Sequence, residues 1–134
     1  MALNPKAVGI RYSDFKINFD YHPINKDLTK NTNEDSIKRA IKNLLFTDYY
    51  ERPFQPKLGA GLKDFLFENI DDTTALSIQE RIINTINKYE PRAILNLVEV
   101  KADADYNRYD AKIVFYTINN PEPVTFNTLL TRVR

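Results

Sequence analysis

Residues 94–131 read ILNLVEVKADADYNRYDAKIVFYTINNPEPVTFNTLLT, and this stretch decides the fold. Apolar and polar residues alternate over 94–102 and 124–130, while residues 111–118 are largely apolar on both faces. A period of two is typical of strands, and a strand that is apolar on both faces belongs in the middle of a sheet. Because the connections are short, we expect antiparallel neighbours. The pattern predicts a three- to four-stranded antiparallel meander with residues 123–131 at one edge.

Two amphipathic helices are predicted before this meander. The first is expected over residues 33–46, with capping side chains at Thr32 and Asn33, and a short helical piece follows at 62–67. The long helix begins after the capping residues 71–73 and ends before Pro91. This order predicts an α+β fold with both main helices on one face of the sheet. The helical stripes are Ile37, Ala40, Ile41, Leu44 and Leu45, and then Ala75, Ile78, Ile82, Ile83, Ile86 and Tyr89.

The chain of 134 residues is long enough for one domain. We expect residues 33–134 to form this domain and residues 1–32, which are rich in turn formers, to form an N-terminal arm. Phe15, Ile17, Phe19 and Tyr21 alternate with polar residues, which predicts a strand over 15–21 or an arm laid on the core or on a partner.

Charge and composition exclude several classes of protein. The 19 Lys and Arg residues balance 18 Asp and Glu residues, so the net charge of +1 argues against a protein that coats nucleic acid. The longest apolar run, residues 113–116, is far short of the ~20 residues that span a bilayer, and the N-terminus shows no secretory signal. Without cysteine the chain has no disulfide and no thiolate metal site.

Catalytic motifs are weak in this sequence. His22 is the one histidine, and it precedes Pro23 with no nucleophile motif beside it. A pair of carboxylates suffices for glycoside hydrolysis, but 18 acids make such a pair unspecific. The segment 59–61 lacks the spacing of a phosphate-binding loop. We therefore assign no catalytic residue, metal, cofactor or small-molecule substrate, and peptidoglycan hydrolysis stays an alternative that no residue supports.

Two polar segments are candidate contact sites. Glu90 in the last turn of the long helix faces the negative end of the helix dipole, so we expect a cation opposite it. The alternative is that Glu90 points to solvent and that Pro91-Arg92 only ends the helix. The loop at 47–61 holds two prolines and two of the three glycines. Its residues Glu51, Arg52 and Phe54 are candidate contacts, unless Phe54 and Leu58 fold back on the core.

The order and spacing of these segments resemble the lysozyme-like baseplate wedge family of contractile tails, in particular the small wedge subunits, or sheath initiators, of T-even-like phages. The resemblance covers residues 22–131 and extends more distantly to the baseplate subunit of type VI secretion systems. The segments that carry it are Leu44-Leu45-Phe46-Thr47, Glu51-Arg52-Pro53 with Pro56 and Gly59, Leu66-Phe67-Glu68, Glu90-Pro91-Arg92 and the meander.

The resemblance implies a structural subunit of the virion baseplate, assembled in the host cytoplasm, that docks on larger wedge proteins and templates the first ring of tail sheath. It implies that Glu90, Pro91 and Arg92 are the wedge-contact site, with the cation opposite Glu90 supplied by a partner and Arg92 meeting an acid there. The family name also suggests muramidase activity, which no residue of this sequence supports.

An exposed edge strand supplies a mechanism for sheath initiation, because its free backbone groups accept a strand from another chain. We expect residues 123–131, or the arm at 15–21, to pair with the tail sheath protein. Pro121 and Pro123 limit this edge at its start. The candidate pairing positions are Val124, Phe126, Thr128 and Leu130.

Overall fold

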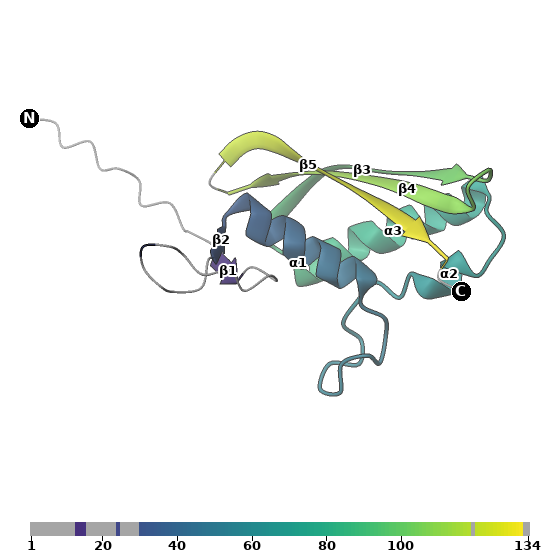
Figure 1. The fold of residues 1–134 in the computed structure, drawn as a ribbon, viewed down its shortest axis with the longest axis horizontal. Coiled ribbons are helices and arrows are strands. Elements are labelled where there is room, and N and C mark those ends of the chain that lie inside the picture. The colour runs from purple at the N-terminus through teal and green to yellow at the C-terminus, as the bar shows by residue number, and fades with distance from the viewer. Residues whose placement is uncertain (1–12, 16–23, 25–29, 119, 133–134) are drawn as a thin grey trace, which may run out of the picture.

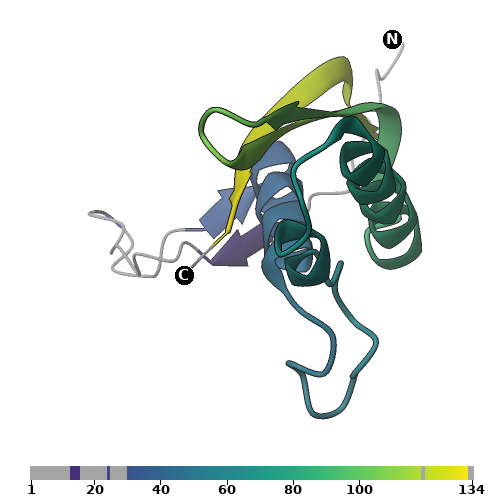
Figure 2. The same ribbon diagram turned by 90° about the vertical axis from the view of Figure 1, so that its right-hand side faces the viewer.

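The protein is seen in a computed structural model that describes residues 13–15, 24, 30–118 and 120–132. Three antiparallel strands, β3 (Ala93–Asp103), β4 (Arg108–Thr117) and β5 (Asn120–Thr131), form an open sheet in the order β3-β4-β5. Helices α1 (Glu34–Phe46) and α3 (Asp72–Tyr89) lie on one face of this sheet, with the short helix α2 (Lys63–Leu66) near the end of β5 (Figure 1). Figure 2 shows the same two layers end on. The predicted α+β fold, with β4 in the middle, is confirmed.

The core lies between the sheet and the two main helices. Ile41 of α1, Ile82 of α3 and Phe115 of β4 are all fully buried. Each apolar side chain of this size contributes about 1.5–3 kcal/mol when it is fully buried. Most positions of the two predicted helical stripes are buried. They are Ile37, Ile41, Leu45, Ala75, Ile78, Ile82 and Ile86.

The two main helices begin differently. The side chain of Asp71 accepts a hydrogen bond from the backbone N–H of Thr74 at 2.6 Å, which is the capping contact that the sequence predicts for α3. Asn33 occupies the same position before α1, but its side chain makes no capping hydrogen bond, so that part of the prediction is wrong. Its backbone, with a φ of 53° and a ψ of −113°, is neither helical nor extended.

The strands are longer than the alternating pattern indicates. β4 begins at Arg108, three residues before the apolar run, and β5 begins at Asn120. Pro121 and Pro123 therefore lie inside β5, where they are tolerated because an edge strand has one side without a hydrogen-bonded neighbour. The register shifts between Leu95, which pairs with Phe115, and Leu97, which pairs with Val114, so the strand has a bulge at Asn96.

The N-terminal segment contains a separate two-stranded sheet. Strand β1 (Ser13–Phe15) pairs antiparallel with β2 (Lys30–Thr32), and β2 leads directly to α1. Of the strand predicted over residues 15–21, only Phe15 belongs to the described residues, and positions 16–21 lie outside them. The division of the chain into an arm (1–32) and a domain (33–134) stays a prediction.

Candidate functional site

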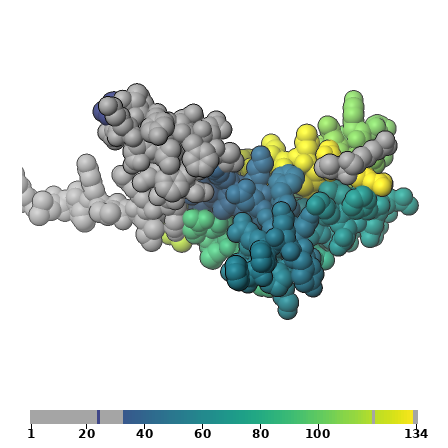
Figure 3. Space-filling model, turned by 60° about the horizontal axis from the view of Figure 1, so that its bottom comes forward, coloured from purple at the N-terminus to yellow at the C-terminus, as the bar shows by residue number. Residues whose placement is uncertain are grey.

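The edge of the sheet at β5 is the first candidate surface. In the part of the chain that the structure describes, β5 pairs with β4 alone, so the backbone groups on its other side have no strand partner. Val124 and Leu130 are buried in the core, and Phe126 and Thr128 are partly buried. These four predicted pairing positions therefore hold β5 in its own sheet, and a second chain would meet the backbone of β5. Figure 3 shows β5 as a yellow band beside α1.

The corner between α3 and β3 contains Glu90, Pro91 and Arg92. Glu90 follows the last residue of α3, and its N–H donates to the carbonyl of Ile86 at 2.8 Å. Its carboxylate is 4% exposed and accepts two hydrogen bonds from Arg92, at 2.5 Å from Nε and 2.6 Å from the second guanidinium nitrogen. Such a two-pronged contact is the strongest geometry between arginine and a carboxylate.

This geometry changes two of the expectations for the corner. The cation expected opposite Glu90 is present, but it is Arg92 of the same chain and not a partner residue. The alternative in which Glu90 points to solvent is wrong, because Glu90 is buried. Burial at the negative end of α3 requires a nearby positive charge, and Arg92 provides it. Pro91 and part of Arg92 remain on the surface of the corner.

The loop between α1 and α2 is a compact protrusion below the sheet (Figures 1 and 3). At its base the N–H of Ala60 lies 3.1 Å from the carbonyl of Leu44 and 3.2 Å from that of Thr47. Farther out, the N–H of Tyr50 donates to the carbonyl of Pro56 at 2.7 Å. Gly59 has a φ of 119°, and a Cβ atom there would lie 2.3 Å from the carbonyl oxygen of Thr47, so only glycine fits.

The tip of this loop carries the predicted contact residues. Phe54 is 97% exposed, and Glu51 and Arg52 are also exposed. The alternative in which Phe54 folds back on the core is therefore wrong. Glu51 has a local role as well, because its carboxylate accepts a hydrogen bond from the N–H of Asp48 at 2.9 Å. An aromatic ring held in water on an ordered loop is a feature of protein interaction surfaces.

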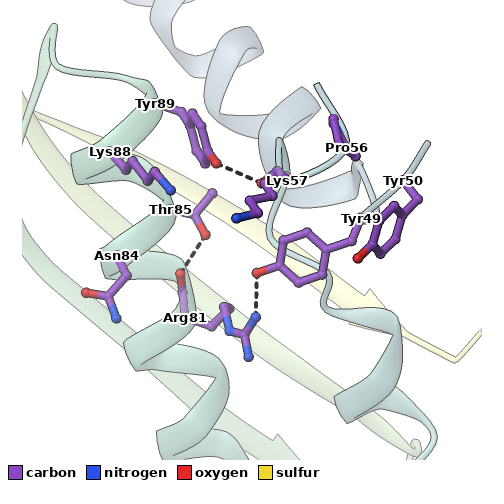
Figure 4. Close-up of a pocket in the computed structure, with 10 residues that line it drawn as sticks. Tyr49, Tyr50, Pro56, Lys57, Arg81, Asn84, Thr85, Lys88 and Tyr89 are labelled. Atoms are coloured by element: carbon purple, nitrogen blue, oxygen red, sulfur yellow. Dashed lines mark hydrogen bonds between the residues drawn. The ribbon is translucent and has the colours of Figure 1, made fainter. Parts of the chain in front are cut away.

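The structure brings the base of the loop against the C-terminal half of α3. The hydroxyl of Tyr89 donates to the carbonyl of Lys57 at 2.7 Å, and a guanidinium N–H of Arg81 donates to the hydroxyl of Tyr49 at 2.5 Å. A cavity of about 470 Å³ lies between the two segments (Figure 4). Its lining includes Tyr49, Tyr50, Pro56, Lys57, Arg81 and Lys88.

Sequence reasoning missed this cavity. Arg81, Thr85 and Lys88 lie at spacings of four and three along α3 and flank its apolar stripe, so their helical spacing is a signal that the sequence does contain. Nothing in the sequence, however, says that the loop folds against that side of the helix. The contact between Tyr89 and Lys57 joins residues 32 positions apart, which local patterns do not reveal.

The described residues show neither a cluster suited to a metal ion nor a helix suited to a membrane span. Among the described residues, no group of three or more His, Cys, Asp or Glu side chains is arranged to hold a metal ion. None of the helices in the described ranges combines the length and the apolar content that crossing a bilayer requires.

The fold and its surfaces define a small α+β protein with a strand edge that no other described strand covers, an ordered aromatic protrusion and a fixed polar corner, a combination typical of subunits in protein assemblies. The chain belongs to the family described as "Baseplate wedge protein gp25", which it matches over residues 31–121. It is 33% identical to baseplate wedge protein gp25 of Enterobacteria phage T4 over 100 residues, which cover 75% of this chain and 76% of that protein. The chain is therefore a structural baseplate component of a contractile tail, and so part of the virion.

Two solved structures share the fold. A putative tail lysozyme from Geobacter sulfurreducens has a TM-score of 0.68 at 24% identity, over 75% of this chain and 92% of that one. A chain of the baseplate of the anti-feeding prophage has a TM-score of 0.61 at 21% identity, over 92% of this chain and 88% of that one. At these identities the likeness concerns the fold alone, so the word lysozyme in the first description assigns no activity to this chain.

Proposed function

We propose that this subunit docks on the larger wedge proteins of the baseplate and templates the first ring of tail sheath, in a tail assembled in the host cytoplasm. The observation that carries the proposal is the edge of β5, which has no second strand partner among the described residues. Such an edge adds a strand from another chain through backbone hydrogen bonds, which set the register without a deep pocket. A polymerising sheath requires a first template of this kind.

The core contacts of β5 make it suitable for this task. Val124 near the middle of β5 and Leu130 near its end anchor the strand in the core, at 7% and 1% exposure, while Thr125, Asn127 and Leu129 remain exposed. A rigid template adds a strand at a lower entropic cost than a strand that must first become ordered. The edge is therefore preorganised for pairing.

Docking on the wedge proteins is assigned to the corner at 90–92 and the tip of the loop. Glu90 holds Arg92 in one orientation and, together with Pro91, gives the corner a fixed shape. Phe54 supplies an apolar anchor of the kind that fills a pocket on a partner. In this proposal Glu90 acts inside the subunit, and the partner touches Pro91, Arg92 and Phe54.

The experiment for the edge replaces one backbone N–H at a time. In an antiparallel strand, successive residues direct their N–H groups to opposite sides, so Asn127→Pro and Thr128→Pro remove donors on different sides of β5. The variant that loses a bond to β4 will melt at a lower temperature than the wild type. The variant that loses a donor on the free edge will keep the wild-type melting temperature.

Each variant is then used to complement a phage that lacks this chain, and the tails are imaged by negative-stain electron microscopy. The free-edge variant is expected to give baseplates without sheath. If it forms sheath of normal length, the edge of β5 is not the template. Loss of the baseplate itself would contradict the assignment of docking to the corner and the loop, because β5 would then be needed at that earlier step.

A further inference from the structure

The cavity between the loop and α3 is bordered by three cations that have no anionic partner among the described residues. Lys57 comes from the loop, and Arg81 and Lys88 come from α3 (Figure 4). The described ion pairs involve other cations, namely Lys63, Arg92, Lys101 and Arg108. Three like charges around one cavity repel one another, and an anion placed between them would remove that repulsion.

Aromatic side chains orient two of these cations, Arg81 and Lys88. The guanidinium of Arg81 lies 5.6 Å from the centre of the Tyr49 ring and 5.3 Å from that of Phe65. The ammonium of Lys88 lies 5.1 Å from the centre of the Tyr89 ring. Contacts of this kind orient a cation without neutralising it. The charges are therefore positioned in advance and remain available to a ligand.

The nearby acids are turned away from the cavity. Asp48 forms an ion pair with Lys63 at 2.5 Å, and the carboxylate of Glu51 accepts the N–H of Asp48. Neither residue lines the cavity. Tyr49 and Tyr50 also line a neighbouring hollow that contains Asp48, Lys63 and Asp64. The two tyrosines thus lie between a hollow of mixed charge and the cationic cavity.

We propose that this cationic cavity binds an acidic segment of a partner protein. Two or more carboxylates spaced along an extended chain would match cations that lie on two different elements. The walls fit such a segment, because they combine tyrosine rings and hydroxyls with the amide of Asn84. The site lies on the helical side of the subunit, so it is distinct from the edge of β5 and does not depend on sheath pairing.

The experiment titrates the full-length protein with acetylated hexaglutamate and follows backbone amide shifts by NMR. The largest shifts are expected at residues 49–57 and 81–89. The double variant Lys57→Gln/Lys88→Gln should weaken binding at least fivefold, as should raising the salt concentration from 50 to 500 mM. The matched control, Lys38→Gln/Lys42→Gln on α1, changes the net charge equally and should weaken binding less than twofold. Unchanged melting temperatures show that both variants are folded.

Three results would overturn the proposal. The first is no binding of hexaglutamate at 50 mM salt. The second is an equal loss in both double variants, because the peptide would then respond to net charge alone. The third is inorganic phosphate that causes the same shifts and displaces the peptide at equal concentration, because the cavity would then be a site for small anions. Failure of sheath assembly in the β5 variants would affect none of these readings.

Discussion

Replacing Glu90 by glutamine tests whether the polar corner is part of the subunit's own structure. The change keeps the size of the side chain and removes the charge that faces Arg92. In the wild type, Glu90 is 4% exposed and accepts two hydrogen bonds from Arg92, while the Arg92 side chain is 32% exposed. We expect Glu90→Gln to destabilise the fold, because one acceptor is lost and a partly buried guanidinium loses its counter-charge.

The size of the effect follows from the exposure of the pair. Removing one partner of a fully buried ion pair costs about 3–5 kcal/mol. Water reaches about a third of Arg92, and glutamine keeps one acceptor oxygen, so the estimate falls to about 1.5–3 kcal/mol. Removing the negative charge of residue 90 from the negative end of the α3 dipole stabilises the fold by about 0.3–1 kcal/mol. The net loss of ~0.5–2.7 kcal/mol corresponds to a melting temperature lower by about 2–13 °C for a chain of this size.

The assay is thermal unfolding followed by circular dichroism, with Glu99→Gln as the matched control. Glu99 also pairs with a cation two residues ahead, Lys101 at 3.2 Å, but the two side chains are 44% and 72% exposed. Such a surface pair contributes about 0–1 kcal/mol, so the control should melt within ~5 °C of the wild type. If Glu90→Gln melts together with Glu99→Gln, the corner does not stabilise the subunit and the reasoning is refuted.

Three further predictions concern the loop and the start of α3. Gly59→Ala should loosen the loop, because its φ of 119° and the carbonyl oxygen of Thr47, 2.3 Å from where a Cβ atom would lie, exclude a side chain; faster tryptic cleavage after Lys57 would show it, and unchanged cleavage would contradict it. Phe54→Ala should leave the melting temperature unchanged because the ring is 97% exposed, yet abolish incorporation into baseplates in a complementation assay. The backbone N–H of Thr74 lowers the pKa of Asp71, so this contact stabilises the fold above about pH 4 and is lost as the pH falls through the lowered folded-state pKa. In acid titrations Asp71→Asn should therefore retain more of its neutral-pH stability than the wild type does.

The elements of the domain were predictable because their signals are local. The apolar spacing along α3 and the capping side chain of Asp71 lie within the helix they define, and the doubly apolar run of β4 identifies the middle strand. The prediction of a cap failed where the path of the chain outside the helix determines the structure. Asn33 has the chemistry of a cap, but the chain enters α1 from β2 with a φ of 53° and the side chain makes no capping contact.

The candidate site was predictable only in part. The sequence indicated that Glu90 needs a cation, because the helix dipole acts on any residue at that position. It did not reveal that Arg92 supplies the charge, because a turn of two residues brings both side chains to one side. The exposure of Phe54 was not predictable, because the apolar character of a residue does not show whether its side chain is buried in the core or exposed to water.

The edge of β5 and the cationic cavity are separate surfaces, and their separation affects how two partners would be arranged on the subunit. The edge of β5 lies in the sheet layer, while the cationic cavity lies between α3 and a loop on the helical side (Figures 1 and 4). A partner on one surface therefore leaves the other sterically free, and the rigid core between them fixes the angle at which two partners meet. A flexible linker would join the same partners without setting that angle. Under the proposed function, the buried isoleucines of α1 and α3 contribute to assembly as well as stability, because they hold the geometry that a polymerising sheath would copy.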